Sequence, residues 1–144
     1  MAKQVPDSRA SDQNVELLRR FYESFNQNDL DSVLELCSED VEIYKDPEVV
    51  EMVAAFMPRG RERVAQYLRG WLDSWGEYQV RPEKFLQSGE EVAVLTRNRA
   101  RGKNSQFEIE GDMADVFTVR EGRIASLRLY IERDTAMDAL GIAV

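Results

Sequence analysis

The most restrictive feature of the sequence is a change of hydrophobic period at Gly76. Before this glycine, apolar side chains recur at the spacing of one helix face, at Val64, Tyr67, Leu68, Trp71, Leu72 and Trp75. After it, the pattern alternates every second residue over four segments, at about 78–87, 91–101, 106–119 and 123–132. A helical pattern from Asp134 to Leu140 follows. The second half is therefore predicted to be a helix, four strands and a closing helix.

The first half adds two helices and one strand. A polar stretch to about residue 11 precedes a helical stripe, with Ser11 or Asp12 as N-cap. The stripe consists of Val15, Leu18, Phe21, Tyr22 and Phe25. Asp29 can cap a second, short helix. "VEIYKDP" then alternates briefly and stops at Pro47, which is typical of an edge strand. Residues 48–57, between two prolines, are predicted to form a short amphipathic turn or helix, which is a candidate lid.

Helices followed by an antiparallel meander indicate an α+β domain in which a curved antiparallel sheet wraps around the N-terminal helices. The chain has 144 residues, 43% of them hydrophobic, which suffices for one compact domain. We expect a flexible N-terminal tail over residues 1–11 and a single domain over residues 12–144.

The composition limits the chemistry. The chain contains no histidine, which removes Ser-His-Asp and Cys-His machinery, histidine-bound metals and the usual base at neutral pH. The single cysteine, Cys37, excludes an internal disulfide and falls among apolar positions of the second predicted helix, where a free thiol acts as a small core residue. We expect no metal and no cofactor, so acid and base chemistry would use carboxylates, tyrosines or lysines.

Charge and hydropathy restrict the partners. The net charge of −8 disfavours nucleic acid, because a binding surface needs clustered Lys and Arg. No apolar run reaches the roughly 18 residues of a membrane span. The start MAKQVPDSRASDQN is polar and lacks the apolar region of a signal peptide. A cytoplasmic protein without a nucleic-acid or membrane partner is expected.

An acidic residue interrupts the apolar face of the stretch "GDMADVFTV". Asp115 shares that face with Ile109, Gly111, Met113, Phe117 and Val119. A loop at 102–105 would set Arg99 opposite Glu108 and Arg97 opposite Glu110 on the solvent face. The inner face then also carries Val94, Thr96 and Asn98.

The last hairpin decides what surrounds Asp115. "VREGR" favours a three-residue loop with Gly122 left-handed and Val119 opposite Arg123. That register places an apolar set on the Asp115 face, namely Ala125, Leu127, Leu129 and Ile131. Asp115 is therefore predicted to point between sheet and helices without a cation, where desolvation raises the pKa of a carboxyl group.

Three segments in this order resemble the SnoaL-like and ketosteroid isomerase-like branch of the nuclear transport factor 2-like superfamily. They are "LLRRFYESFNQNDLDSVLELCSEDVEI", "GRERVAQYLRGW" and "FTVREGRIASLRLYIERDTAMDALGI". The resemblance implies a cone-shaped α+β domain, cystatin-like in fold, with a deep apolar pocket and often a homodimer. The mixed outer face of Ala114, Val116, Ser126 and Tyr130 also favours a homodimer.

The resemblance implies roles for particular residues. The isomerases of this family carry a base in an Asp-Pro pair after the first strand, which corresponds to Asp46 in "YKDPE". Their protonated acid on the strand before the last hairpin corresponds to Asp115, and this isomerase is a standard example of a neutral carboxylic acid. Their oxyanion tyrosine falls on Phe21, with Tyr22 one residue away on a different face. The epoxide hydrolase branch is disfavoured, because Arg97 and Arg99 point outward.

The candidate site combines the catalytic pair Asp46 and Asp115 with a ligand pocket. The predicted pocket residues are Phe21, Tyr44, Phe56, Tyr67, Trp71, Asn98, Met113, Phe117, Leu127 and Leu129. The expected ligand is small and apolar, of steroid or polyketide type. The expected function is a cofactor-independent isomerase or cyclase that transfers protons on a carbonyl compound. The alternative is a non-catalytic ligand-binding or dimerisation domain, in which Asp115 is a structural acid and Asp46 opens a turn.

Overall fold

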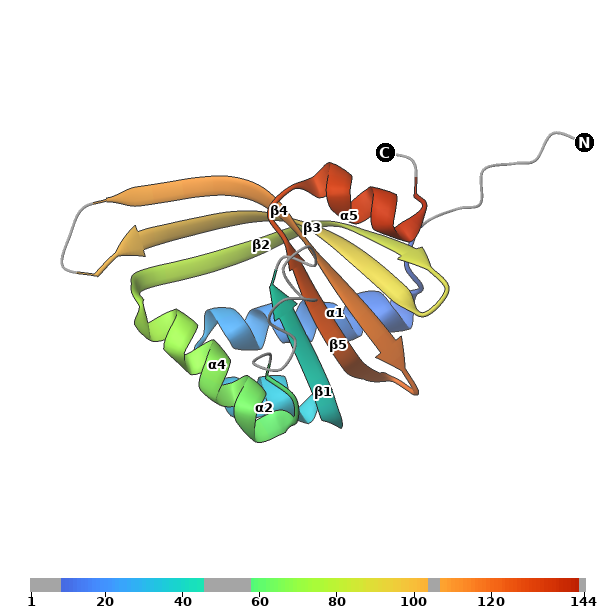
Figure 1. Cartoon of the computed structure of the whole chain (residues 1–144), viewed down its shortest axis with the longest axis horizontal. Helices are drawn as coiled ribbons and strands as arrows, with labels where there is room; N and C mark the ends of the chain where they lie inside the picture. The colour runs from blue at the N-terminus through green and yellow to red at the C-terminus, as the bar shows by residue number, and fades with distance from the viewer. Residues whose placement is uncertain (1–8, 46–57, 104–106, 143–144) are drawn as a thin grey trace, which may run out of the picture.

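The computed structural model describes residues 9–45, 58–103 and 107–142 (Figure 1). Asp46, Phe56 and the segment 48–57 lie outside the described residues. Residues 9–11, which were expected to belong to the flexible tail, lie along the strand Trp75–Ser88. Here the Ala10 N–H donates to the Phe85 carbonyl at 3.2 Å, and the Ser11 N–H donates to Gln87 Oε1 at 3.0 Å.

The described helices are α1 (Asp12–Asn26), α2 (Leu30–Glu35), α4 (Arg61–Asp73) and α5 (Arg133–Leu140). The predicted caps are confirmed: Ser11 accepts from the Asn14 N–H and Asp29 from the Ser32 N–H, each at 3.2 Å. Within the described ranges, no helix is long and apolar enough to cross a membrane.

The strands are β1 (Cys37–Lys45), β2 (Trp75–Ser88), β3 (Glu91–Gly102), β4 (Glu108–Arg120) and β5 (Arg123–Tyr130). They form one sheet in the order β1-β5-β4-β3-β2. The meander from β2 to β5 is antiparallel, as predicted, and β1 is an edge strand. The expectation of a purely antiparallel sheet is wrong, because β1 pairs with β5 in parallel. The domain is therefore α+β with an open, curved, mixed sheet.

Cys37 begins β1 and is not part of the second helix, since α2 ends at Glu35. The thiol is nonetheless a core group: the residue is buried, and desolvation raises its pKa to about 11. It behaves as the small apolar residue that the sequence indicated.

The helices lie on both faces of the sheet (Figure 1). The concave side is filled by the apolar stripes of α1, α2 and α4 against inward residues of all five strands. A second, smaller cluster lies between α5 and the other face; it contains Leu86, Ala93, Leu95, Ala114, Val116, Tyr130, Ala136, Met137 and Leu140. The outer-face argument for a homodimer is therefore wrong, because α5 of the same chain buries Ala114, Val116 and Tyr130.

The β3–β4 register differs by two residues from the prediction. Arg99 lies opposite Glu110 and Arg101 opposite Glu108, so each residue keeps its predicted face. The predicted ion pairs still form, but diagonally: Arg97 contacts Glu110 at 2.9 Å and Arg99 contacts Glu108 at 3.0 Å. These pairs are exposed and contribute little to stability.

The β4–β5 turn also differs. It has two residues, Glu121 at φ 52° and Gly122 at φ 74°, between the paired Arg120 and Arg123. Positive φ at both positions is the geometry of a type I′ turn, whose twist matches that of the strands. A bulge after Thr118 restores the predicted face farther along, where Leu127 and Leu129 point inward.

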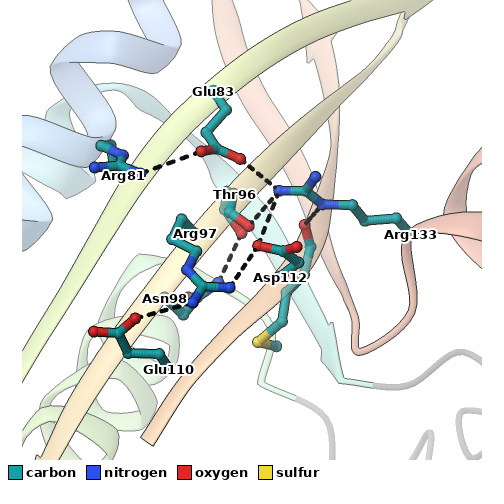
Figure 2. A network of polar contacts seen from close by, with 9 residues as sticks. Arg81, Glu83, Thr96, Arg97, Asn98, Glu110, Asp112 and Arg133 are labelled. Atoms are coloured by element: carbon teal, nitrogen blue, oxygen red, sulfur yellow. Dashed lines mark hydrogen bonds and ion pairs between the residues drawn. The ribbon is translucent and has the colours of Figure 1, made fainter.

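One arginine ties α5 to the middle of the sheet (Figure 2). Arg133 donates to the Thr96 carbonyl at 2.8 Å and to the Met113 carbonyl at 3.2 Å. Thr96 and Met113 are direct partners across β3 and β4, so one guanidinium binds both carbonyls of a single strand pair. Arg133 also contacts Glu83 at 2.8 Å on the surface.

Candidate functional site

The inward orientation predicted for Asp115 is confirmed: its residue is only 8% exposed, on the helix side of β4. Its partner is Tyr22 on α1, whose hydroxyl donates to Asp115 Oδ2 at 2.6 Å. Tyr22 is 2% exposed. The hydrogen bond therefore joins the first helix to the fourth strand inside the core.

Burial is the main influence on this pair. Desolvation raises the pKa of Asp115 to about 6, and the hydrogen bond from Tyr22 partly opposes that rise. Burial, with the nearby carboxyl group, raises the pKa of Tyr22 well above its ordinary value. Tyr22 thus stays a hydroxyl donor, while Asp115 can exchange its proton near neutral pH.

Aromatic packing fixes the pair. Phe117, two residues after Asp115 on the same face, contacts Phe21 edge-on at 5.1 Å and Tyr22 at 5.9 Å between ring centroids. Phe21 and Tyr22 also meet edge-to-face, at 5.3 Å. Such contacts hold the whole Tyr22 side chain in one position, which keeps its hydroxyl at the carboxyl group.

Asp115 and Tyr22 border a cavity of about 70 Å³ between α1, α4 and the sheet. Its lining residues are Phe21, Tyr22, Phe25, Ile43, Tyr67, Leu68, Trp71, Tyr78, Val80, Asn98, Met113, Asp115, Leu127, Leu129 and Ile131. Neither lysine nor arginine is among these described residues. Exposure increases from the buried Tyr22 and Asp115 to Ile131, which is 60% exposed. The acid therefore lies at the closed end.

The cavity is smaller than expected. Small-molecule sites commonly have volumes of about 300–1,000 Å³, and an engineered apolar cavity that holds benzene has about 150 Å³. A ligand of steroid or polyketide size would require a wider opening than the about 70 Å³ of this structure.

A second polar group lies on the same cavity. The Tyr78 hydroxyl donates to Asn98 Oδ1 at 3.0 Å, and Asn98 Nδ2 donates to Thr96 Oγ1 at 2.8 Å. Burial, and to a lesser extent the Asp115 carboxyl group, raise the pKa of Tyr78 to about 12, although a hydrogen bond with Trp71 lowers it.

The structure brings most predicted pocket residues together at this cavity. Beside Asp115, the lining includes Phe21, Tyr67, Trp71, Asn98, Met113, Leu127 and Leu129. Phe117 lies behind the lining as a fully buried support for the rings of Phe21 and Tyr22. Tyr44 does not line the cavity, because alternation along β1 directs its neighbour Ile43 inward, and its hydroxyl contacts Glu42.

Tyr22 is the functional residue that the sequence analysis misplaced. It stands four residues after Leu18 and three before Phe25, and all three side chains are buried on the same face of α1. Helical spacing alone would have placed its hydroxyl in the core. The other lining residues not predicted are Phe25, Ile43, Leu68, Tyr78, Val80 and Ile131.

Residues 18–127 match the SnoaL-like domain family. The chain belongs to this family. No curated protein matches its sequence. Among solved structures, this SnoaL-like domain resembles a nuclear transport factor 2-like protein of unknown function from Burkholderia pseudomallei, with 21% identity and a TM-score of 0.72 over 90% of this chain and 98% of the other.

Two further structures share the fold. A putative polyketide cyclase from Xanthomonas campestris has 20% identity and a TM-score of 0.71, over 89% of this chain and 96% of that one. TerC, co-crystallised with polyporic acid, has 18% identity and a TM-score of 0.71, over 89% and 97% of the two chains. At these identities the likeness establishes the fold of the SnoaL-like domain.

Proposed function

We propose that this SnoaL-like domain binds a small carbonyl compound in the cavity and transfers protons on it without a cofactor, as an isomerase or cyclase. The observation that carries the proposal is the buried Asp115 carboxyl group, hydrogen-bonded by Tyr22 and bordering a cavity without a cationic lining residue. A carboxylic acid in such a site can donate a hydrogen bond to a ligand oxygen. The putative polyketide cyclase of the same fold, and TerC co-crystallised with polyporic acid, support a small organic ligand.

The reaction has two roles. A base removes a proton from the carbon next to the carbonyl, and the bonding pair moves into the carbonyl to form an enolate oxygen. Asp115, polarised by Tyr22, donates its hydrogen bond to that oxygen. The base then returns the proton to carbon. We assign the role of base to Asp46 on the family resemblance.

The alternative is ligand binding without catalysis, which the small cavity of about 70 Å³ favours, because it leaves little room for a ligand to rearrange. A homodimer stays a prediction from the family resemblance alone.

Deuterium exchange separates the two functions. In D₂O, acetophenone should exchange its methyl protons for deuterium faster in the presence of the protein than in buffer alone. The loss of the methyl signal in the ¹H NMR spectrum measures the rate. General acid or base catalysis contributes about 100-fold or more, so Asp46→Asn should lose at least about 100-fold of the exchange rate. Asp115→Asn should lose less, since an amide still donates a weaker hydrogen bond. Because the neutral acid is required, exchange should decline as pH rises above the Asp115 pKa of about 6.

Asp112→Asn is the matched control: it is the same substitution on the same strand, at an exposed residue paired with Arg97. Its exchange rate should equal that of the unmodified protein. Saturable acetophenone binding with exchange at the buffer rate would reject catalysis and leave the binding alternative.

A further inference from the structure

The amide of Asn98 has unused hydrogen-bonding capacity on the cavity. An asparagine side chain offers two N–H donors and two acceptor lone pairs. Tyr78 uses one acceptor position and Thr96 one donor, which leaves one N–H and one lone pair without a partner among the described residues. One donor beside one acceptor is the complement of a hydroxyl group.

The surroundings hold this amide in place and provide no cation beside it among the described lining residues. Thr96 is fully buried, and Tyr78 holds the Asn98 oxygen from the β2 side while it contacts Trp71. The lining provides no lysine or arginine at this end, and the neighbouring Arg97 pairs with Glu110 and Asp112 on the other face. The site therefore suits a neutral hydroxyl better than a carboxylate.

The register gives the spacing between Asn98 and the acid. Asp115 lies opposite Val94, and Asn98 is four residues farther along β3, which corresponds to about 13 Å at the rise of a strand. Side chains on the concave face of a curved sheet converge, so the polar ends lie closer together than the backbone positions. Two hydrogen bonds of about 2.8 Å then leave less than about 7 Å between the two ligand oxygens.

The oxygens of two para substituents on one aromatic ring fit within that separation, and the aromatic side chains of Phe21, Phe25 and Trp71 line the same cavity. A single ring also requires the least widening of the cavity of about 70 Å³, since a cavity that holds benzene has about 150 Å³. A longer, two-oxygen polycyclic ligand would overrun this spacing.

We propose that the ligand is a para-hydroxylated aryl ketone, bound with its carbonyl oxygen at Asp115 and its hydroxyl at Asn98. The inference rests on the proposed function, because it takes the carbonyl position from that site. Asn98 is the specificity-determining contact. Tyr78 is a positioning residue, which acts by holding the Asn98 amide.

Titration calorimetry with two probes of similar shape tests the contact between Asn98 and the ligand hydroxyl. The titrations are done at a pH below the Asp115 pKa of about 6. 4-Hydroxyacetophenone presents the second hydroxyl, and 4-methylacetophenone replaces it by a methyl group. The unmodified protein should bind the hydroxylated probe about tenfold more tightly, the effect of one net hydrogen bond. Asn98→Leu and Tyr78→Phe should each reduce the preference to about twofold or less. Affinity for the methyl probe should change by less than about threefold.

Tyr67→Phe is the control, since Tyr67 lines the cavity without belonging to the Tyr78–Asn98 group; it should keep the tenfold preference. Equal binding of the two probes by the unmodified protein would overturn the Asn98 contact and leave the Asp115 site standing. The Asn98 contact would also be overturned if Asn98→Leu and Tyr78→Phe both kept the tenfold preference for the hydroxylated probe. Failure of both probes to bind would overturn the carbonyl site as well. Tyr78→Phe keeps the test decisive if Asn98→Leu does not fold.

Discussion

Asp115→Asn should leave stability nearly unchanged at about pH 4 and raise the free energy of unfolding by about 3 kcal/mol at about pH 8. The substitution keeps the size of the side chain and an oxygen that accepts from the Tyr22 hydroxyl. It removes the group whose ionisation opposes folding.

The sign follows from the raised pKa. Asp115 has a pKa of about 6 in the folded chain, above the value of about 3.9 in an unfolded chain. Between these values the folded state holds a proton that the unfolded chain has released. Stability from Asp115 therefore falls as pH rises from about 4 to about 6, and stays low above that. The exposed acids Asp29, Glu83 and Asp112 have lowered pKa values and act in the opposite direction, but equally in both proteins.

Urea denaturation of both proteins across this pH range gives the difference directly, because terms common to both cancel. Destabilisation by Asp115→Asn that grows toward high pH would contradict the account, since it would require an ionised carboxylate with a stabilising partner.

Arg133→Met should lower the free energy of unfolding by about 2–4 kcal/mol, because it removes two hydrogen bonds from a charged donor, to the carbonyls of Thr96 and Met113. Methionine keeps much of the side-chain stem, so the loss reports mainly on the hydrogen bonds. Arg133→Lys should lower the free energy of unfolding by about half as much as Arg133→Met. One ammonium group keeps the charge but cannot reproduce the planar, two-pronged geometry of the guanidinium group.

Arg120→Met is the matched control. Arg120 makes an exposed pair with Glu90, so its replacement should change the free energy of unfolding by less than about 0.5 kcal/mol. Chemical denaturation of the three variants measures the effect. Equal stabilities of Arg133→Met and Arg120→Met would contradict this account, because they would show that the two hydrogen bonds of Arg133 add nothing measurable to stability.

Local patterns predicted most of the fold. The stripes of α1 and α4, the caps Ser11 and Asp29, and the alternation of β3 and β4 depend on neighbours in sequence, so periodicity reveals them. Registers depend on turns and bulges, and the bulge after Thr118 leaves no clear mark in the sequence. The parallel pairing of β1 with β5 depends on contacts across about 80 residues, which no local pattern encodes.

The site was predicted only in part, because some of its features depend on local alternation and others on tertiary packing. The inward face of Asp115 follows from alternation on β4, and that face survives a register shift of two. Its partner Tyr22 comes from α1, ninety-three residues away, and only tertiary packing brings the two together. The support of Asn98 by Tyr78 likewise joins two strands whose register includes a bulge.

The central claim is that the Asp115 carboxyl group is held by Tyr22 with a raised pKa. The most direct measurement is the pH titration of its carboxyl carbon by ¹³C NMR, assigned by its loss in Asp115→Asn. The account predicts a midpoint at about pH 6, and a higher midpoint in Tyr22→Phe, because the hydrogen bond that lowers the pKa is removed. A midpoint at or below about 4 in the unmodified protein, the range of an exposed or salt-bridged aspartate, would contradict it.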